Sequence, residues 1–462
     1  MDLHEYLEQV TGQMRCMKAR DMVAEELKNH IEDQAESYEE FGLGKEEAQI
    51  RAVEQMGDPI EVGTSMDRIH RPKIDVRLIL FIVMFTVLGV ALQMLKQQSE
   101  TTVNDAAQWI GGRPGLLSVC ANAGIGLLVM FAVMFLDYSI LGKHPKLVWC
   151  GLLLLLVLAA GSGITFYSFD GGALQMSFSN TNINILNAVL ILSFAALVYD
   201  YRNKGYKGIL LCLFWLFAAS ILCTRIQGIS LAAGISFFAA GTLVISFAVQ
   251  KEWFRVKKGK GQLLLWGSWM IPVILLLTGI LTGVIGRNYQ TARIRYFFDP
   301  QMAAQGGGYV TLTMRERLAG LHFWGGSLSE GEANWWYSFN YVLEKYGIAV
   351  GIILVAALAL LFGRMLAGML HQKNRLGSLL GVSCISYLVI TTLLHILTAL
   401  TLVPATSAFL PFLDMDSRNA VISSYLLLGV YLSVYRNTNI LPEKWNEPAK
   451  RVRILVERVE KG

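Results

Sequence analysis

The sequence has few charged residues and few prolines for its length. Of its 462 residues, 16% are charged and 10 are proline, whereas 54% are hydrophobic. Soluble domains usually carry about 25% charged residues, so this composition excludes an ordinary soluble protein. The six cysteines show no Cys-x-x-Cys or other metal-ligand spacing, and most lie in apolar runs, where cysteine usually serves as a small core residue.

The sequence also lacks the short motifs of enzymes that act on soluble substrates. It contains no phosphate-binding loop, dinucleotide-binding fingerprint, metal-ligand cluster or nucleophile elbow. We therefore expect no cofactor and no metal ion, and nothing in the sequence indicates a nucleic-acid partner.

The two signs of charge are distributed unevenly along the chain. Residues 1–73 hold 17 acidic and 9 basic residues, although the whole chain has a net charge of +5. Such an asymmetry indicates separate domains. We predict an acidic cytoplasmic domain over 1–73, a basic membrane domain over 74–440 and a basic cytoplasmic tail over 441–462.

The first 70 residues have the pattern of a small helical domain. Apolar residues recur at helical spacing, and Asp58-Pro59 has the form of a helix cap followed by a first-turn proline. The run GLGKEEAQIRAVEQMGDPIEV, from Gly42 to Val62, is similar to the permease-prefix (HAAS-type) domain. That resemblance implies a cytoplasmic module that binds a partner protein; the alternative is a spacer.

Ten apolar stretches are long enough to cross a bilayer, which takes about 20 helical residues each. The pattern therefore predicts an all-α, polytopic membrane protein with a small helical domain in front of it. The predicted spans are 76–95, 115–137, 147–168, 182–200, 207–223, 228–249, 263–285, 347–369, 378–402 and 419–435.

Lysine and arginine occupy every second connection between these spans. The segments before the first span and after the tenth are basic too. Examples of these basic residues are Lys73, Lys146, Lys204, Lys257, Arg375 and Arg436. Basic loops stay on the cytoplasmic side of a membrane. We therefore expect both termini in the cytoplasm and the long segment 286–346 on the outer side.

Several short motifs follow the seventh predicted span. They are Arg293-Ile294-Arg295-Tyr296-Phe297-Phe298-Asp299-Pro300, Gly308-Tyr309, Glu344-Lys345-Tyr346-Gly347, Val403-Pro404-Ala405-Thr406 and Leu410-Pro411-Phe412. Their order, on a chain of ten apolar spans, resembles the SEDS family of bacterial cell-shape and division proteins (FtsW/RodA/SpoVE). The resemblance implies a location in the bacterial cytoplasmic membrane and a role in peptidoglycan assembly.

The same resemblance implies a lipid-linked substrate and a partner enzyme. The substrate would be the undecaprenyl-linked peptidoglycan precursor, and the partner a single-span class B penicillin-binding transpeptidase. The precursor's pyrophosphate requires cations, and arginine binds phosphate oxygens in pairs. Arg293 occupies the family's arginine position, and Arg295, Arg315 and Arg317 are further substrate-binding candidates because they lie nearby in sequence.

The chain departs from the family where catalysis is expected. The family carries an Asp-Phe pair near the end of the outer loop, whereas this chain has Trp336-Tyr337. An indole can only donate a hydrogen bond, so Trp336 cannot accept a proton. Glu332 is retained four residues earlier and is the candidate catalytic carboxylate.

Three interpretations follow from this departure. The chain is a non-catalytic scaffold for a transpeptidase, a glycosyltransferase with a relocated carboxylate, or a transporter of a lipid or solute. On the second interpretation the base is one of the carboxylates expected on the outer side: Glu332, Asp299, Asp414 or Asp416.

Overall fold

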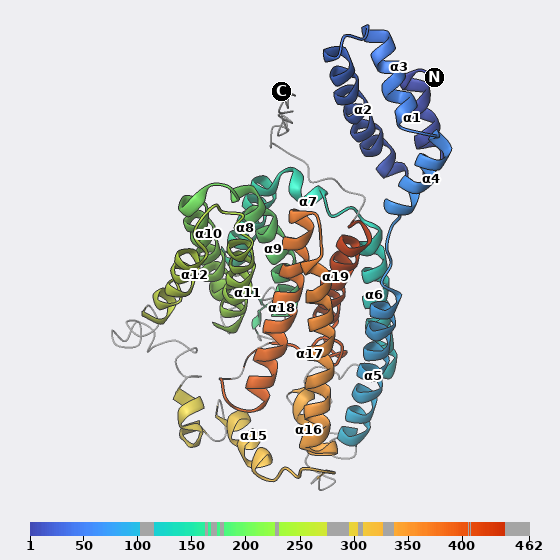
Figure 1. Ribbon diagram of the computed structural model, residues 1–462. Helices are drawn as coiled ribbons and strands as arrows, with labels where there is room; N and C mark the ends of the chain where they lie inside the picture. Colours follow the sequence, from blue (N-terminus) through green and yellow to red (C-terminus); the bar gives the residue numbers. More distant parts are fainter. Residues whose placement is uncertain are drawn as a thin grey trace, which may run out of the picture. The chain divides into compact units, whose positions relative to one another are not determined.

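The computed structural model describes residues 1–101, 115–161, 165–167, 173–175, 180–226, 231–274, 295–303, 308–326, 337–404, 406 and 408–438. The chain divides into two compact units, Met1–Arg71 and Pro72–Thr438. Both units are built from helices (Figure 1), as the sequence predicts.

The first unit is a bundle of four helices: α1 (Leu3–Gly12), α2 (Met17–Glu40), α3 (Lys45–Gln55) and α4 (Pro59–Ile69). The Asp58 carboxylate accepts a hydrogen bond from the Glu61 backbone N–H and Pro59 opens α4, which confirms the predicted cap. Apolar side chains from α1, α2, α3 and the α1–α2 connection form one core: Tyr6, Val10, Met14, Ala19, Val23, Leu27, Ile31, Ala35, Ala52 and Val53.

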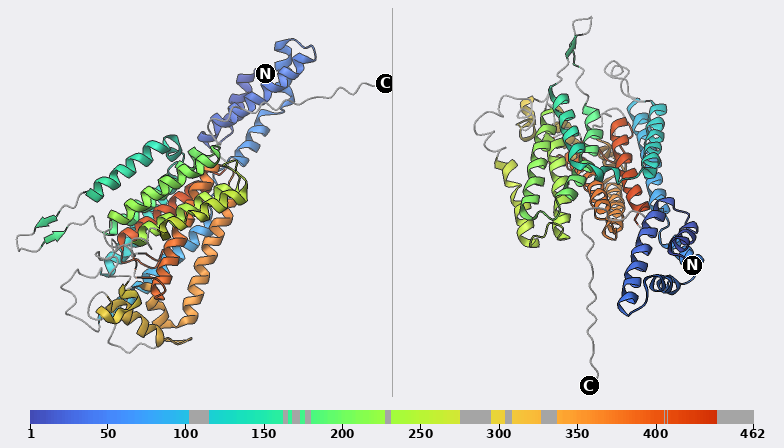
Figure 2. Two further views of the ribbon diagram at one scale, coloured as in Figure 1. Left: turned by 90° about the vertical axis from the view of Figure 1, so that its left-hand side faces the viewer. Right: turned by 90° about the horizontal axis from the view of Figure 1, so that it is seen from above.

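The second unit is larger and contains the long apolar helices. Its elements are α5 (Val76–Thr101), α6 (Leu116–Phe135), α7 (Ile140–Lys143), α8 (Pro145–Gly161), β1 (Thr165–Tyr167), β2 (Ala173–Gln175), α9 (Asn180–Tyr201), α10 (Gly205–Ile226), α11 (Leu231–Gln250), α12 (Lys258–Gly267), η2 (Pro300–Ala303), α15 (Tyr309–Ala319), α16 (Ser338–Tyr346), α17 (Ile348–Leu370), α18 (Arg375–Ala399) and α19 (Arg418–Arg436). The strands pair antiparallel and lie beyond the ends of the helices (Figure 2).

Seven helices in the described chain are long and apolar enough to span a membrane. They are Val76–Lys96, Leu116–Phe135, Asn184–Tyr201, Gly205–Thr224, Ala233–Gln250, Ile348–Leu370 and Arg375–Ala399. The apolar part of α8 is shorter, Pro145–Val157, and α19 occupies the tenth predicted span. The predicted span 263–285 continues outside the described residues. The structure therefore confirms a polytopic membrane protein, and the number of ten spans stays a prediction.

Burial separates central from peripheral helices in this unit. In α9, α11 and α18, 72% of an 18-residue apolar stretch is buried inside the protein. The corresponding buried share is 33% in α5 and 28% in α6. The exposed faces of α5 and α6 carry large apolar side chains such as Leu80, Val87 and Leu128. A lipid environment suits these faces, because hydrocarbon solvates them as well as protein does.

Small residues allow several helices to approach closely. A Cβ at Gly126 of α6 would lie 2.7 Å from the Val421 side chain of α19, and one at Gly429 would lie 2.8 Å from the Met130 carbonyl oxygen. Gly347 has φ +92°, a left-handed value that favours glycine, and it joins α16 to α17.

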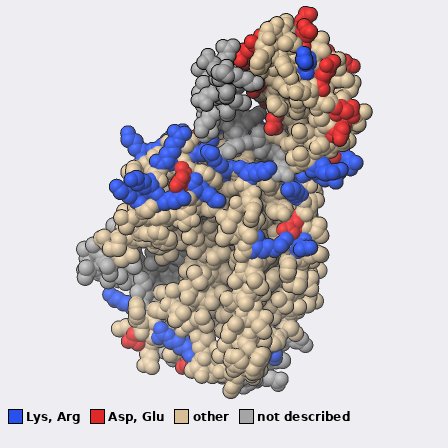
Figure 3. Space-filling view, viewed as in Figure 1, with Lys and Arg blue, Asp and Glu red and all other residues tan. Residues whose placement is uncertain are grey.

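The basic connections meet at one end of the second unit. The Asn203 N–H, after α9, donates to the Trp253 carbonyl after α11 at 2.9 Å, and Lys146 forms an ion pair with Asp200 at 3.1 Å. Figure 3 shows lysine and arginine side chains gathered along this end. The side of the membrane that this end faces stays a prediction.

Candidate functional site

Two of the predicted substrate-binding arginines lie on α15 and contact different parts of the protein. Arg315 donates to the Phe297 carbonyl at 2.8 Å, and its guanidinium lies 5.3 Å from the Phe297 ring centre. Arg317 forms a 3.6 Å ion pair with Glu344, which is 4% exposed on α16. Both arginines therefore stabilise the segments around α15 and α16.

Of the other predicted site residues, the structure describes Arg295. Arg295 is exposed at the start of the turn before Pro300. Arg293, Glu332 and Trp336 lie outside the described residues. Substrate-binding and catalytic roles for all of these residues stay predictions.

The segment between α18 and α19 packs tightly against α5. A Cβ at Gly89 would overlap the Phe412 carbonyl oxygen, and the Phe85 and Phe412 ring centres lie 5.7 Å apart. The Thr86 and Tyr425 hydroxyl groups share a hydrogen bond. Phe412 itself has φ +71°, a strained value for a residue with a side chain. These contacts fix a polar turn, residues 413–417, at the end of the bundle.

A buried histidine links this turn to α16. His395 of α18 is 1% exposed, and its Nδ1 lies 3.1 Å from the Ala408 carbonyl oxygen and 3.4 Å from Asp414 Oδ2. Its ring meets the Tyr337 ring edge to face at 5.2 Å. Tyr337 directly follows Trp336 in the chain, the residue at which the sequence analysis expects the family's acid.

Lys96 and Asp416 form the second part of the polar cluster. Lys96, near the end of α5, is 7% exposed. Burial and the neighbouring Asp414 carboxylate raise the pKa of Asp416, while Lys96 and the backbone N–H groups of Asp416 and Ser417 partly offset this rise.

An amide on α6 completes the cluster. The Asn122 side chain donates to the Met415 carbonyl at 3.0 Å and accepts from Arg418 Nε at 3.1 Å. The cluster therefore contains two carboxylates, Asp414 and Asp416, and two cations, Lys96 and Arg418. Among the described residues, no group of three or more His, Cys, Asp or Glu side chains is placed to hold a metal ion.

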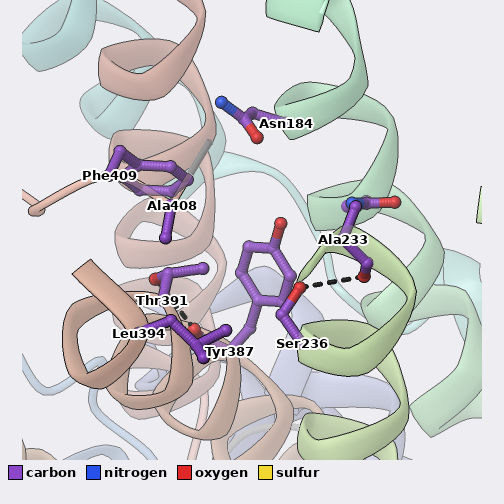
Figure 4. A pocket seen from close by; sticks show the side chains of 9 residues that line it. Asn184, Ala233, Ser236, Tyr387, Thr391, Leu394, Ala408 and Phe409 are labelled. Carbon is purple, nitrogen blue, oxygen red and sulfur yellow. Dashed lines mark hydrogen bonds between the residues drawn. The ribbon is translucent and has the colours of Figure 1, made fainter. Parts of the chain in front are cut away.

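A small pocket lies between α9, α11 and α18 (Figure 4). Its wall includes the polar side chains of Asn184, Ser236, Tyr387 and Thr391, and it has room for about one water molecule. Ser236 donates to the Ala233 carbonyl and Thr391 to the Tyr387 carbonyl. This pocket is too small for a sugar or a lipid tail.

The sequence analysis did not single out Lys96, although a signal was present. Thr86, Gly89, Gln93 and Lys96 recur at helical spacing of three and four residues, and all four are buried on one face of α5. Polar residues on one face of a membrane helix usually face the protein interior. The same reasoning applied to the first span would have selected this face.

Sequence comparisons identify related proteins, although no protein-family model matches the chain. The probable peptidoglycan glycosyltransferase FtsW of Synechocystis is 27% identical over 182 residues, covering 37% of this chain and 46% of the relative. Stage V sporulation protein E of Bacillus subtilis is 23% identical over 328 residues, covering 68% of this chain and 85% of the relative. The chain thus spans about half of the first relative and most of the second.

Solved structures share the fold. A chain of a peptidoglycan synthase complex matches with a TM-score of 0.57 and 17% identity, covering 79% of this chain and 98% of that chain. The rod shape-determining protein RodA of Thermus thermophilus matches with a TM-score of 0.50 and 15% identity. The match covers 79% of this chain and 97% of the RodA chain. The chain is thus similar in sequence to FtsW and stage V sporulation protein E and shares its fold with RodA, as the resemblance to the SEDS family predicts.

Proposed function

We propose that this chain acts in peptidoglycan assembly in the bacterial cytoplasmic membrane, where it binds a lipid-linked saccharide precursor. The observation that carries the proposal is the alignment with a probable peptidoglycan glycosyltransferase. The apolar helices of the second unit supply the membrane location. A precursor with a prenyl tail and a sugar head fits a protein whose polar cluster lies at the end of such a bundle.

A partner follows from the structural relative. That relative belongs to a peptidoglycan synthase complex that coordinates polymerisation and crosslinking. We propose a single-span class B penicillin-binding transpeptidase as the partner in the membrane. The four-helix unit Met1–Arg71, with its acidic surface, is proposed to bind a second protein in the cytoplasm.

The proposed role is to hold the precursor for the partner without the family's own catalytic acid. Trp336 stands where that acid is expected and cannot accept a proton. Arg293 matches the family's arginine, so Arg293→Ala should weaken precursor binding by about tenfold, as expected for the loss of a charge-assisted contact.

The test is to measure precursor binding and glycan polymerisation by the purified full-length protein, alone and with its co-purifying partner. Glu332→Gln should leave both within about twofold of the wild type, because one loop carboxylate contributes little to stability. If Glu332 were a relocated base, the same change would reduce polymerisation by about 10²–10⁴-fold. Robust polymerisation lost in Glu332→Gln would refute the scaffold role.

Membrane orientation can be tested by cysteine labelling. In a background with the six native cysteines replaced, a cysteine at position 327 should react with an impermeant maleimide in intact cells, because 286–346 is predicted outside. A cysteine at Gly259, in the first turn of α12 directly after the basic α11–α12 connection, should react only after the cells are opened. The reverse labelling pattern would overturn the proposed orientation.

A further inference from the structure

The short segment 321–326, which follows α15, is attached by backbone hydrogen bonds to the first turn of α17. The Ile348 N–H donates to the His322 carbonyl and the Ala349 N–H donates to the Phe323 carbonyl, each at 3.1 Å. The first N–H groups of a helix have no acceptor within the helix, so these two carbonyls supply the missing partners. The segment is therefore held in a fixed position at the start of α17.

Two glycines make this attachment close. A Cβ at Gly347 would lie 2.8 Å from the Phe323 carbonyl oxygen and 3.1 Å from the Cα of Trp324. A Cβ at Gly326 would lie 2.5 Å from the carbonyl oxygen of Lys345, the second-last residue of α16. The segment thus contacts the end of α16 as well as the start of α17.

The segment leaves two aromatic side chains exposed. Phe323 is 57% exposed and Trp324 is 68% exposed. Their ring centres lie 5.3 Å apart, with the ring planes at 90°. The six residues of the segment, LHFWGG, include no aspartate, glutamate, lysine or arginine. Exposed apolar patches of this kind mark contact with another protein or with a membrane.

The length of α17 indicates where this aromatic pair lies. The helix has 23 residues, Ile348–Leu370. At 1.5 Å per residue it is about 34 Å long, and the hydrocarbon core of a bilayer is about 30 Å thick. The exposed residues His371 and Lys373 directly follow its last turn, which therefore ends at one boundary of the core. Its first turn, with the 321–326 segment attached, then lies at the opposite boundary, where Figure 1 shows α15 and α16.

Apolar exposure continues from the segment into α17. Ile352 is 58% exposed and Ile353 is 61% exposed, one turn after the two residues that hold the segment. Such side chains on a membrane helix face lipid. Tryptophan is enriched where lipid meets water, because its ring is apolar and its N–H can donate to water or to a headgroup. A lipid surface therefore fits the aromatic pair.

We propose that the 321–326 segment is an interfacial anchor, in which Phe323 and Trp324 insert among the lipid headgroups at the membrane surface. Because the segment directly follows α15 and contacts α16, the anchor holds both helices at that surface. The anchor depends on the membrane location of α17 and not on precursor binding, so it goes beyond the proposed function.

The experiment measures the depth of spin labels on the full-length protein in nanodiscs of phosphatidylethanolamine and phosphatidylglycerol. In a background with the six native cysteines replaced, a nitroxide is attached to Trp324→Cys, Leu360→Cys or Glu316→Cys. Leu360 is 75% exposed in the middle of α17 and marks the lipid interior, whereas the exposed Glu316 of α15 marks water. A water-soluble nickel chelate should collide with the label at position 324 about three- to tenfold less often than at position 316, and more often than at position 360, the order expected for an interface.

A second measurement uses the native aromatic pair. Brominated lipids quench tryptophan fluorescence on contact, and subtracting the signal of Trp324→Phe from the wild type isolates this indole among the ten tryptophans. Lipids brominated near the headgroup should quench this difference signal about twofold more than lipids brominated near the chain end, because the indole sits at the interface. Trp149→Phe is the control: Trp149 is fully buried, so neither lipid should quench its difference signal.

Two results would overturn the anchor. If the nickel chelate reaches position 324 as readily as position 316, the aromatic pair faces water, as a platform for stacking sugars would. If neither the chelate nor the brominated lipids reach the pair, a second copy of the chain covers it. Either result refutes the anchor and leaves the proposed function, which is measured by precursor binding, untouched.

Discussion

Replacing Gly89 with alanine is expected to destabilise the membrane unit by about 3 kcal/mol or more, at the upper end of the usual cost of overpacking. The added Cβ would overlap the Phe412 carbonyl oxygen, which belongs to the backbone and cannot rotate away. Either α5 or the turn that follows Phe412 must move. Because that turn carries Asp414 and Asp416, the variant should also lose whatever binding depends on them.

Gly124→Ala is the matched control for this prediction. Gly124 also lies within a membrane helix, α6, but a Cβ there would meet no atom within 4 Å. Alanine has a higher helix propensity than glycine, so the control should be neutral or slightly stabilising. Thermal unfolding of both variants in detergent, followed by size exclusion, measures the difference. Equal melting temperatures would show that α5 and the turn do not pack as described.

The parts of the fold that depend on local pattern could be predicted from the sequence. Apolar runs predicted the membrane helices, because the bilayer imposes the same minimum length on each of them. The Asp58-Pro59 pair predicted where α4 begins, because a helix cap involves only neighbouring residues. The motif order between Arg293 and Phe412 predicted the resemblance to the SEDS family, which the relatives and the shared fold support.

The polar cluster could be predicted only in part. The helical spacing of Thr86, Gly89, Gln93 and Lys96 marks one face of the first span, but Lys96 follows that predicted span by one residue and so resembles a flanking charge in water, whereas in the structure α5 continues to Thr101 and Lys96 is buried. The packing of this face against the distant Phe412 is a long-range contact, which leaves no signal in one sequence.

The predicted substrate-binding arginines on α15 show a different limit of sequence-based prediction. Arg315 and Arg317 are two residues apart, and proximity in sequence suggested a shared pyrophosphate site. Residues two apart on a helix point in different directions, and on α15 they reach different partners, Phe297 and Glu344. A structural contact and a ligand contact use the same guanidinium chemistry, so residue type alone does not separate them.

Removing the Glu344 carboxylate should be the second large effect. Glu344→Ala is expected to cost about 3–5 kcal/mol, because Arg317 loses its buried ion-pair partner and retains its charge. Glu344 has further interactions, and their loss adds to the cost. Thermal unfolding of the full-length protein measures the change. Glu316→Ala, which removes an exposed carboxylate from α15, is the control and should change stability by less than about 0.5 kcal/mol.

A double variant separates the ion pair from the other contacts of Glu344. Arg317→Met removes the stranded charge, so Arg317→Met combined with Glu344→Ala should be more stable than Glu344→Ala alone, with a coupling of about 1–3 kcal/mol. Additive effects would mean that the pair contributes nothing, and Glu344 would then act through its other contacts. Coupling would show that the pair joins α15 to α16, the helix that begins directly after Tyr337.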